Sequence, residues 1–439
     1  MAMYRGAEAD RRSPGRLVCR LTARTASEAS SMATAHAPSS LLLGAIRSAR
    51  SRYGGVLRRP GALGFFLPAA LARLGVAMTG LGLLFSVQHT SGSFALAGAA
   101  TGSFAVAEAA VGPQVARLVD RWGQTVTVPA VTVVHVVAII AAVLLAGSAP
   151  VAVTLATVVV AGAAMPQPGA LSAARWAGLL AEPTALRVAF SLEATVNDVA
   201  FLVGPVLATL ASSLLLPWAG SAAAAMLVAV GCVVVSLQRS TAPRPHGPRV
   251  SDAREPSPVL AVPGFRWTLG VNLGLGCFFG AVPLLVTAVA ADRGLQTVTG
   301  VVLALSSAAS IVAGLAYGAL RTSPRPQAVQ LMASIVLCGA ALIGAAWPTL
   351  AGLAVMLLVG GTAIAPLVAS SSQIVQATVP AASLTQGFTW INSASAAGIA
   401  FGAALTGILV ARSGAGSAAI GLVSLVLIAV ASAVLAARR

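Results

Sequence analysis

The residues best suited to do chemistry are four ionisable side chains inside long apolar segments, namely Arg73, Glu108, His135 and Asp198. Each lies about nine or ten residues from the same end of its segment, or roughly 13 to 16 Å at a helical rise of about 1.5 Å per residue. Because the four depths agree, we expect the side chains to lie in one plane. Ionisable groups are costly in hydrocarbon, so they should face a protein interior or a wet cavity.

Two interpretations of this plane differ in function. In the first, Asp198 or Glu108 exchanges a proton, Arg73 favours the ionised carboxylate, and substrate competes for the charge. In the second, Arg73 forms a static ion pair with Asp198 or Glu108 that only holds helices together. A single histidine on an apolar helix, such as His135, is more often a packing residue than a ligand.

A few uncharged or peripheral groups extend the set of coupling and substrate candidates. Glu193 and Asn197 are four residues apart and share one helix face. Polar contacts from the second half of the chain are expected from Asn272, Gln373, Asn392, Ser393 and Ser395. The alternative is that these groups only form hydrogen bonds between helices.

A short charged segment, Arg117-Leu-Val-Asp-Arg-Trp-Gly-Gln124, lies between two apolar segments. Only 9% of the residues are charged, yet Arg117, Asp120 and Arg121 fall within five positions. We expect a loop that acts as a hinge between two helices. A carboxylate here would be stabilised by any helix N-terminus that it faces, and the alternative is a plain basic turn.

Composition identifies an integral membrane protein. The chain is 57% hydrophobic with a mean hydropathy of +0.90, and apolar runs of about 20 residues recur. Inside a bilayer every backbone polar group must be satisfied within the protein, so runs this long should be helices. A transmembrane barrel would need shorter, alternating segments.

Twelve apolar segments, six on each side of a polar stretch, predict an all-α fold of about 12 transmembrane helices in two six-helix bundles. The first six are Leu63 to Val87, Phe94 to Ala116, Val126 to Leu145, Val151 to Leu171, Leu192 to Leu214 and Pro217 to Leu237. The second six are Trp267 to Ala290, Thr297 to Leu320, Val329 to Ala346, Leu350 to Ser370, Phe388 to Val410 and Ala415 to Ala436. The expected divisions are a disordered basic tail (1–61), a first bundle (62–237), a proline-rich linker (238–265) and a second bundle (266–439).

The net charge of +16 follows the membrane topology rather than forming a nucleic-acid surface. All 27 basic residues are arginine; 24 fall on the side of the N-terminus and only Arg293 and Arg412 on the other, with Arg73 inside a segment. This bias predicts that both termini and the linker are cytoplasmic. We expect the protein to lie in the plasma membrane. Binding of anionic lipid or nucleic acid by the basic tail is the alternative.

An internal repeat supports two related halves. A shift of 198 positions aligns Gly162 with Gly360, Pro168 with Pro366, Phe190 with Phe388, Ser191 with Thr389 and Gly204 with Gly402. Parallel repeats about an axis along the membrane normal are one arrangement of transporter halves.

Three stretches resemble the major facilitator superfamily. In the charged segment, Leu118, Val119, Asp120, Arg121 and Gly123 match that family's loop between helices two and three, whereas Ala116, Gln124 and Thr125 depart from it. Gly204-Pro205-x-x-Ala208 resembles the end of its antiporter motif, and Phe388-Thr-Trp-Ile-Asn392 lies in a stretch similar to actinobacterial transporters of the family.

The resemblance implies alternating access by two rocking bundles. It implies a gating segment of Arg117, Asp120, Arg121 and Gly123, in which the aspartate faces the start of the eleventh helix and helps to hold the outward-facing state. It also implies a kink at Gly204 and Pro205. The favoured function is proton-coupled efflux of a small amphipathic or apolar compound by a monomer. The alternatives are a nutrient uptake permease and a non-transporting membrane sensor.

No motif in the chain indicates an enzyme. A chain without lysine cannot supply a phosphate-binding loop of the usual kind, and we find no metalloprotease or nucleophile-elbow motif. The cysteines Cys19, Cys232, Cys277 and Cys338 have neither metal nor redox spacing. We therefore expect no catalytic residues, metal or cofactor.

Overall fold

The computed structural model describes residues 50–245, 259–262, 264–295, 298–320, 322 and 324–437. Two units are distinguished, Met1–Ser51 and Arg52–Arg439, and the membrane-spanning helices belong to the second. The expected tail lies outside the described residues up to position 49, and its residues 50–57 are helical. Most of the linker, residues 246–258, also lies outside them.

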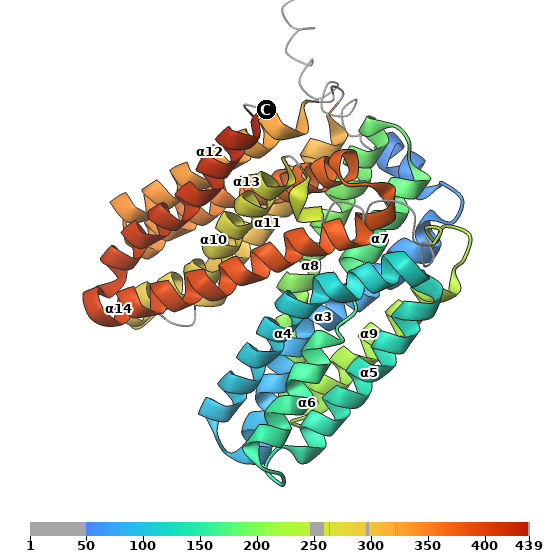
Figure 1. Ribbon diagram of the computed structural model, residues 1–439. Helices are drawn as coiled ribbons and strands as arrows, with labels where there is room; N and C mark the ends of the chain where they lie inside the picture. The colour runs from blue at the N-terminus through green and yellow to red at the C-terminus, as the bar shows by residue number, and fades with distance from the viewer. Residues whose placement is uncertain are drawn as a thin grey trace, which may run out of the picture. The chain divides into compact units, whose positions relative to one another are not determined.

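The helices fall into two sets of antiparallel neighbours (Figure 1). The first bundle contains α3 (Ala62–Ser91), α4 (Phe94–Trp122), α5 (Gln124–Leu145), α6 (Val151–Ala163), α7 (Pro168–Leu179), α8 (Pro183–Leu214) and α9 (Ala219–Leu237). After the short helix η1 (Val259–Ala261), the second contains α10 (Phe265–Ala291), α11 (Thr299–Ala319), α12 (Pro326–Ala346), α13 (Leu350–Thr378) and α14 (Leu384–Ala437), with η3 (Ala381–Ser383) before α14.

Eleven crossings among the described residues are long and apolar enough to span a membrane. Val151–Leu179 is one of them, and α14 provides two because its backbone turns at Gly414. The remaining long helix, α4, has 29 residues and carries Glu108 and the charged segment, which makes it more polar than the rest. The predicted all-helical membrane fold with two six-helix bundles is confirmed, and α4 packs beside α3 and α6 in the first bundle.

Two local predictions were wrong. The charged segment is not a loop: α4 continues through Trp122 and α5 starts at Gln124, so that only Gly123, at φ 89°, breaks the helix. The fourth segment is not one helix, because the chain leaves helical geometry between Ala163 and Pro168. Pro166 and Pro168 explain the break, since a proline ring removes an N–H and disfavours helical geometry in the residue before it.

Small residues let α10 and the first part of α14 pack at close range. A Cβ at Gly276 would overlap the backbone of Ser395, and one at Gly402 would overlap the backbone of Cys277. Close backbone approach of this kind drives helix association where the surrounding lipid is as apolar as the side chains. The corresponding contact in the first bundle joins Gly204 of α8 to Ala77 of α3. The predicted kink residue Pro205 lies inside α8, which is continuous from Pro183 to Leu214.

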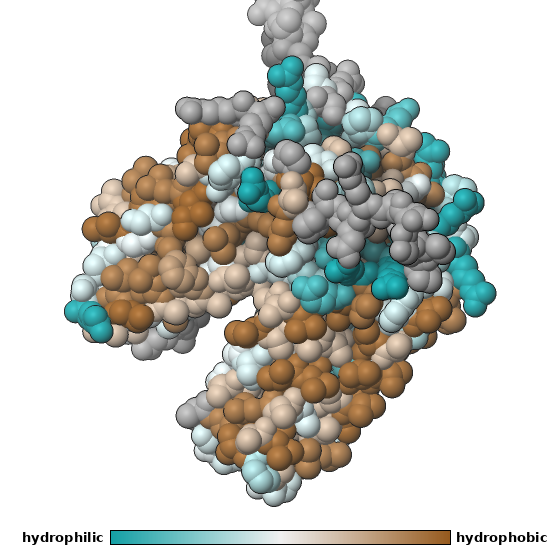
Figure 2. Space-filling model, viewed as in Figure 1, coloured by the Kyte–Doolittle hydropathy of each residue, from teal (hydrophilic) through white to brown (hydrophobic). Residues whose placement is uncertain are grey.

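The two bundles meet toward one membrane face, which we call the Asp120 face. There α4 and α7 pack on α14, and α8 packs on α11 and α13. An apolar core is shared by both bundles at this face and includes Phe65, Trp176, Phe190, Tyr317 and Phe388. Figure 2 shows an open space between the bundles away from this face, and large apolar side chains on the outer surfaces of both.

Candidate functional site

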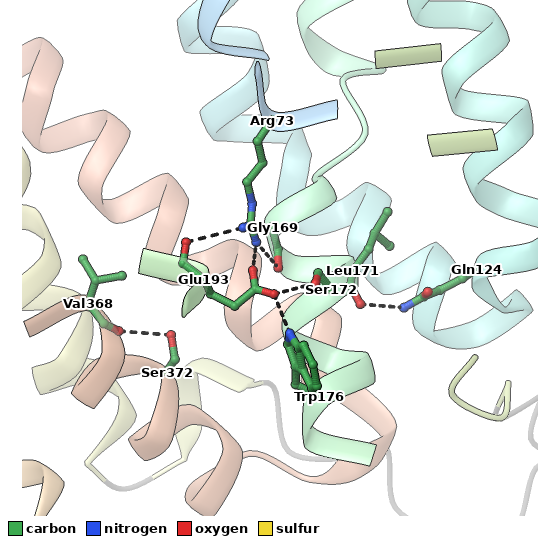
Figure 3. Close-up of polar contacts among 9 residues, drawn as sticks. All are labelled: Arg73, Gln124, Gly169, Leu171, Ser172, Trp176, Glu193, Val368 and Ser372. Atoms are coloured by element: carbon green, nitrogen blue, oxygen red, sulfur yellow. Dashed lines mark hydrogen bonds and ion pairs between the residues drawn. The ribbon is translucent and has the colours of Figure 1, made fainter. Parts of the chain in front are cut away.

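Arg73 and Glu193 form a buried ion pair inside the first bundle (Figure 3). The pair joins α3 to α8, and both side chains are more than nine-tenths buried. The second carboxylate oxygen of Glu193 accepts hydrogen bonds from Ser172 Oγ at 2.6 Å and Trp176 Nε1 at 2.7 Å. The Arg73 guanidinium also donates to the backbone oxygens of Gly169 and Glu193 at 3.4 Å. A buried pair with this many additional bonds is well compensated.

This geometry corrects the predicted pairing, because the partner of Arg73 is neither Asp198 nor Glu108. Among the described residues, Arg73–Glu193 is the one ion pair found. Ser172 and Trp176 were missed, although their four-residue spacing on α7 placed them on one helix face. Both residues lie beyond Leu171, the predicted end of the fourth apolar segment, and were therefore not among the candidates.

Glu108 and His135 make separate contacts, so the four candidates do not meet in one cluster. Glu108 is half-buried on α4 and accepts a hydrogen bond at 3.0 Å from Gln167, in the break between α6 and α7. His135 is fully buried, with Nδ1 2.8 Å from the backbone oxygen of Ala161 and its ring edge-on to Phe104. These surroundings match a packing histidine.

Asp198 lies at the boundary between the bundles. Its carboxylate accepts a hydrogen bond from the hydroxyl of Ser310, which joins α8 of the first bundle to α11 of the second. Of the hydrogen bonds between bundles that the described residues make, this one is the farthest along α8 from the Asp120 face. Asp198 has no basic partner within the described part of the chain.

The neutral candidates divide into exposed and internally bonded groups. Asn197 and Asn392 are exposed. In the second bundle Asn272 donates to Ser371 Oγ at 3.0 Å, Ser395 donates to the backbone oxygen of Asn272, and Gln373 donates to the hydroxyl of Tyr317. Ser393 is buried. Asn272, Gln373 and Ser395 therefore bond to partners within the second bundle.

Asp120 caps the start of α14. One carboxylate oxygen accepts from the backbone N–H of Gln386 at 2.9 Å and the other from that of Thr385 at 3.2 Å. These amides belong to the first turn of α14 and have no partner within the helix. A carboxylate here is also favoured by the positive end of the helix dipole. The other charges of the gating segment, Arg117 and Arg121, are exposed.

A second contact between the bundles places a cation at a helix C-terminus, whereas Asp120 places an anion at a helix N-terminus. Arg187, in the first turns of α8, donates through its guanidinium to the backbone oxygens of Leu320 and Thr322, just past the end of α11. Its guanidinium carbon lies 5.8 Å from the ring centre of Tyr317. The C-terminal carbonyls of a helix favour a cation, so Arg187 and Asp120 fasten two different pairs of helices.

Gln124, a departure from the family's loop pattern, has a structural partner. Its side-chain oxygen accepts from Arg175 Nε at 2.7 Å, and the same guanidinium donates to the backbone oxygens of Val235 and Gln238 at 2.8 Å. Gln238 in turn donates to the backbone oxygen of Gly61 at 2.7 Å. This network joins the ends of α5, α7 and α9 to the start of α3.

The fold and these paired helix-end contacts define a polytopic membrane protein of two related helical bundles. Residues 65–403 match the family model "Major Facilitator Superfamily", and the chain belongs to that family of transporters. No curated protein sequence matches it. Within the described residues no group of three or more metal-binding side chains is found.

Solved transporter structures share the fold at low sequence identity. The chain is similar to a bacterial homologue of the iron transporter ferroportin in an outward-facing state, with a TM-score of 0.69 and 15% identity over 86% of this chain and 99% of that one. For the human organic anion transporter MFSD10 (TETRAN) the TM-score is 0.65 and the identity 18%, over 85% and 98%. For the E. coli fucose:proton symporter FucP they are 0.65 and 13%, over 85% and 98%.

Proposed function

We propose that the chain exports a small amphipathic or apolar compound from the cell in exchange for protons. In this proposal the Asp120 face is cytoplasmic, as the arginine bias indicates, and both termini lie on that side of the plasma membrane. The state described here is then closed toward the cytoplasm and open toward the outside. The observation that carries the proposal is the position of Asp198, a carboxylate at the boundary between the bundles with no basic partner among the described residues.

Proton coupling follows from the two environments that Asp198 would experience. An ionised carboxylate without a basic partner is costly in an apolar interface, and protonation removes that cost. Separation of α8 from α11 would break the bond to Ser310 and admit water, in which ionisation is cheap. A proton taken up in one state and released in the other couples its movement to the rocking of the bundles.

The choice of an apolar substrate rests on how few polar side chains remain free. Asn272, Gln373 and Ser395 bond within the second bundle, and Glu193 is occupied by its own partners. Uptake of a polar nutrient is the alternative, and Asn197 and Asn392 are the exposed amides that it would use. A sugar-like substrate ordinarily needs more such groups.

Transport in proteoliposomes tests the proposal. A panel of apolar dyes and antibiotics is followed with and without an imposed pH gradient, for the wild type, Asp198→Asn and the control Asp292→Asn. Asp292 is an exposed carboxylate at the end of α10. Because asparagine can still accept from Ser310 but cannot exchange a proton, we expect Asp198→Asn to lose at least tenfold in gradient-driven flux while Asp292→Asn does not. Unchanged gradient-driven flux in Asp198→Asn would refute the coupling role.

A further inference from the structure

A short helical segment before α3, residues 52–57, bridges the two bundles at the Asp120 face. Arg52 donates to the backbone oxygens of Ala319, at 3.0 Å, and of Leu320. The hydroxyl of Tyr53 donates to the backbone oxygen of Leu315 at 2.7 Å. All three acceptors belong to the last turns of α11 or its C-cap, and therefore to the second bundle.

The other end of the segment is held by the first bundle. Val56 is buried in the apolar core that both bundles share at the Asp120 face. Five residues later the chain turns at Gly61, at φ 83°, where its backbone oxygen accepts from Gln238, and then enters α3. The segment thus starts on the second bundle and ends on the first.

Two guanidinium groups meet at the end of α11. The backbone oxygen of Leu320 accepts from both Arg52 and Arg187, and neither arginine has an acidic partner in the described part of the chain. Such an arrangement depends on the free carbonyls and the negative end of the helix dipole, both of which belong to the second bundle. When the bundles separate, these bonds lose their acceptors.

The Tyr53 side chain packs against Gly318 of α11. A methyl group at position 318 would overlap the Tyr53 hydroxyl, so Gly318 provides the space for the ring. Burial raises the pKa of Tyr53 to about 12, against the opposing effect of Arg187. The hydroxyl therefore remains protonated and able to donate at neutral pH.

We propose that residues 52–57 form a gating strap, in which Arg52 and Tyr53 hold the Asp120 face closed by fastening the start of the first bundle to α11 of the second. This inference rests on the proposed alternating access, because a strap across the face acts only if the face opens. It adds a third contact to those of Asp120 and Arg187, from a segment outside the transmembrane helices.

Distances between spin labels test the strap without any transported compound. Labels at Trp122→Cys and Arg325→Cys, in a background free of native cysteines, report on the two bundles at the Asp120 face. We compare Arg52→Gln with Tyr53→Phe, singly and together, against Arg58→Gln, an exposed arginine for which no side-chain bond is found within the described residues. Tyr53→Phe retains the ring and removes only the hydroxyl, so folding is preserved.

If the strap acts as proposed, the double variant raises the ratio of open to closed Asp120 face roughly fivefold or more, with smaller increases for the single variants, because each lost bond weakens closure. Arg58→Gln leaves the ratio unchanged. Distance distributions identical to the wild type, or an equal shift in Arg58→Gln, overturn the strap. Since the distances need no proton gradient, failure of proton-coupled transport would leave this result intact.

Discussion

At the scale of single residues, the carboxylates inside the first bundle differ in how they are compensated. Glu193 has a cation and two further donors, whereas Asp198 has one hydroxyl. The first arrangement stabilises an ionised group permanently, and the second leaves room for a change of protonation. We therefore propose that the ion pair stabilises the fold and that Asp198 takes part in the transport cycle.

Glu193→Gln should destabilise the protein. The substitution leaves the Arg73 guanidinium buried without a counter-charge, which typically costs about 3 kcal/mol or more. The midpoint of thermal unfolding in detergent should fall clearly, whereas Glu182→Gln, an exposed carboxylate preceding the same helix, should leave it unchanged.

A double variant separates charge from packing. Arg73→Met combined with Glu193→Gln removes both charges, and we expect it to be more stable than Glu193→Gln alone. A Glu193→Gln protein as stable as the wild type would mean that this glutamate is already neutral, and the ion-pair assignment would be wrong.

The sequence identified the charged candidates but not their partners, because it does not show in which direction each side chain points around its helix axis. Depth along a helix can be counted, and the depth estimate offered Asp198 or Glu108 as the partner of Arg73. Glu193 and Asp198 are five residues apart on α8, so they point about 140° apart around the helix. One faces α3 and α7 and the other faces α11. Counting depth cannot distinguish these directions.

At the scale of elements, we propose that charges at helix ends hold the Asp120 face closed. Asp120→Asn retains an acceptor for one amide of α14 but removes the charge that its N-terminus favours, a loss of about 1 kcal/mol. We expect the open population of the Asp120 face to rise about fivefold. Labelling of single cysteines at the two membrane faces measures this, with Asp292→Asn as the control. Equal labelling in all three proteins would remove Asp120 from the gate.

The internal repeat does not by itself locate the contact that Arg187 makes between the bundles. The shift of 198 positions maps Asp120 onto Gly318, a residue with no side chain that could bond to a helix end. In the structure, the end of α11 is instead contacted by Arg187 of α8, whose guanidinium donates to the backbone oxygen of Leu320. An alignment of positions records a lost carboxylate, but it does not record that a neighbouring helix has supplied a cation.

At the scale of the molecule, hydropathy and the repeat predicted the helices and their division into two bundles. Each span is set by the thickness of the bilayer, which is a property of length and composition. The break between α6 and α7 and the contacts between bundles depend instead on prolines and on long-range packing, neither of which a hydropathy profile records.

The rings of Phe190 and Phe388 provide a test of how the bundles meet. They are 198 positions apart and in contact, with ring centres separated by 5.8 Å. Cysteines at both positions should be joined by a short bifunctional reagent while the Asp120 face is closed. We expect the cross-linked protein to lose transport and to regain it after cleavage of the linker. Efficient transport by the intact cross-linked form would contradict rocking about this contact.

That contact between a residue and its own repeat has a further consequence. It is the internal equivalent of the self-complementary patch in a two-fold dimer, where every substitution appears twice. Here the two copies are parts of one chain, so each can be changed alone. The Asp120 carboxylate accepts from the backbone N–H of Thr385. The shift of 198 positions relates these two residues to Gly318 and Arg187. At that related place the charged group is a cation, because the Arg187 guanidinium donates to a backbone oxygen at the end of α11. Because the two halves are joined in one chain and can differ in sequence, the two related contacts between the bundles can use an anion in one place and a cation in the other. Two identical subunits would have the same residue at both places.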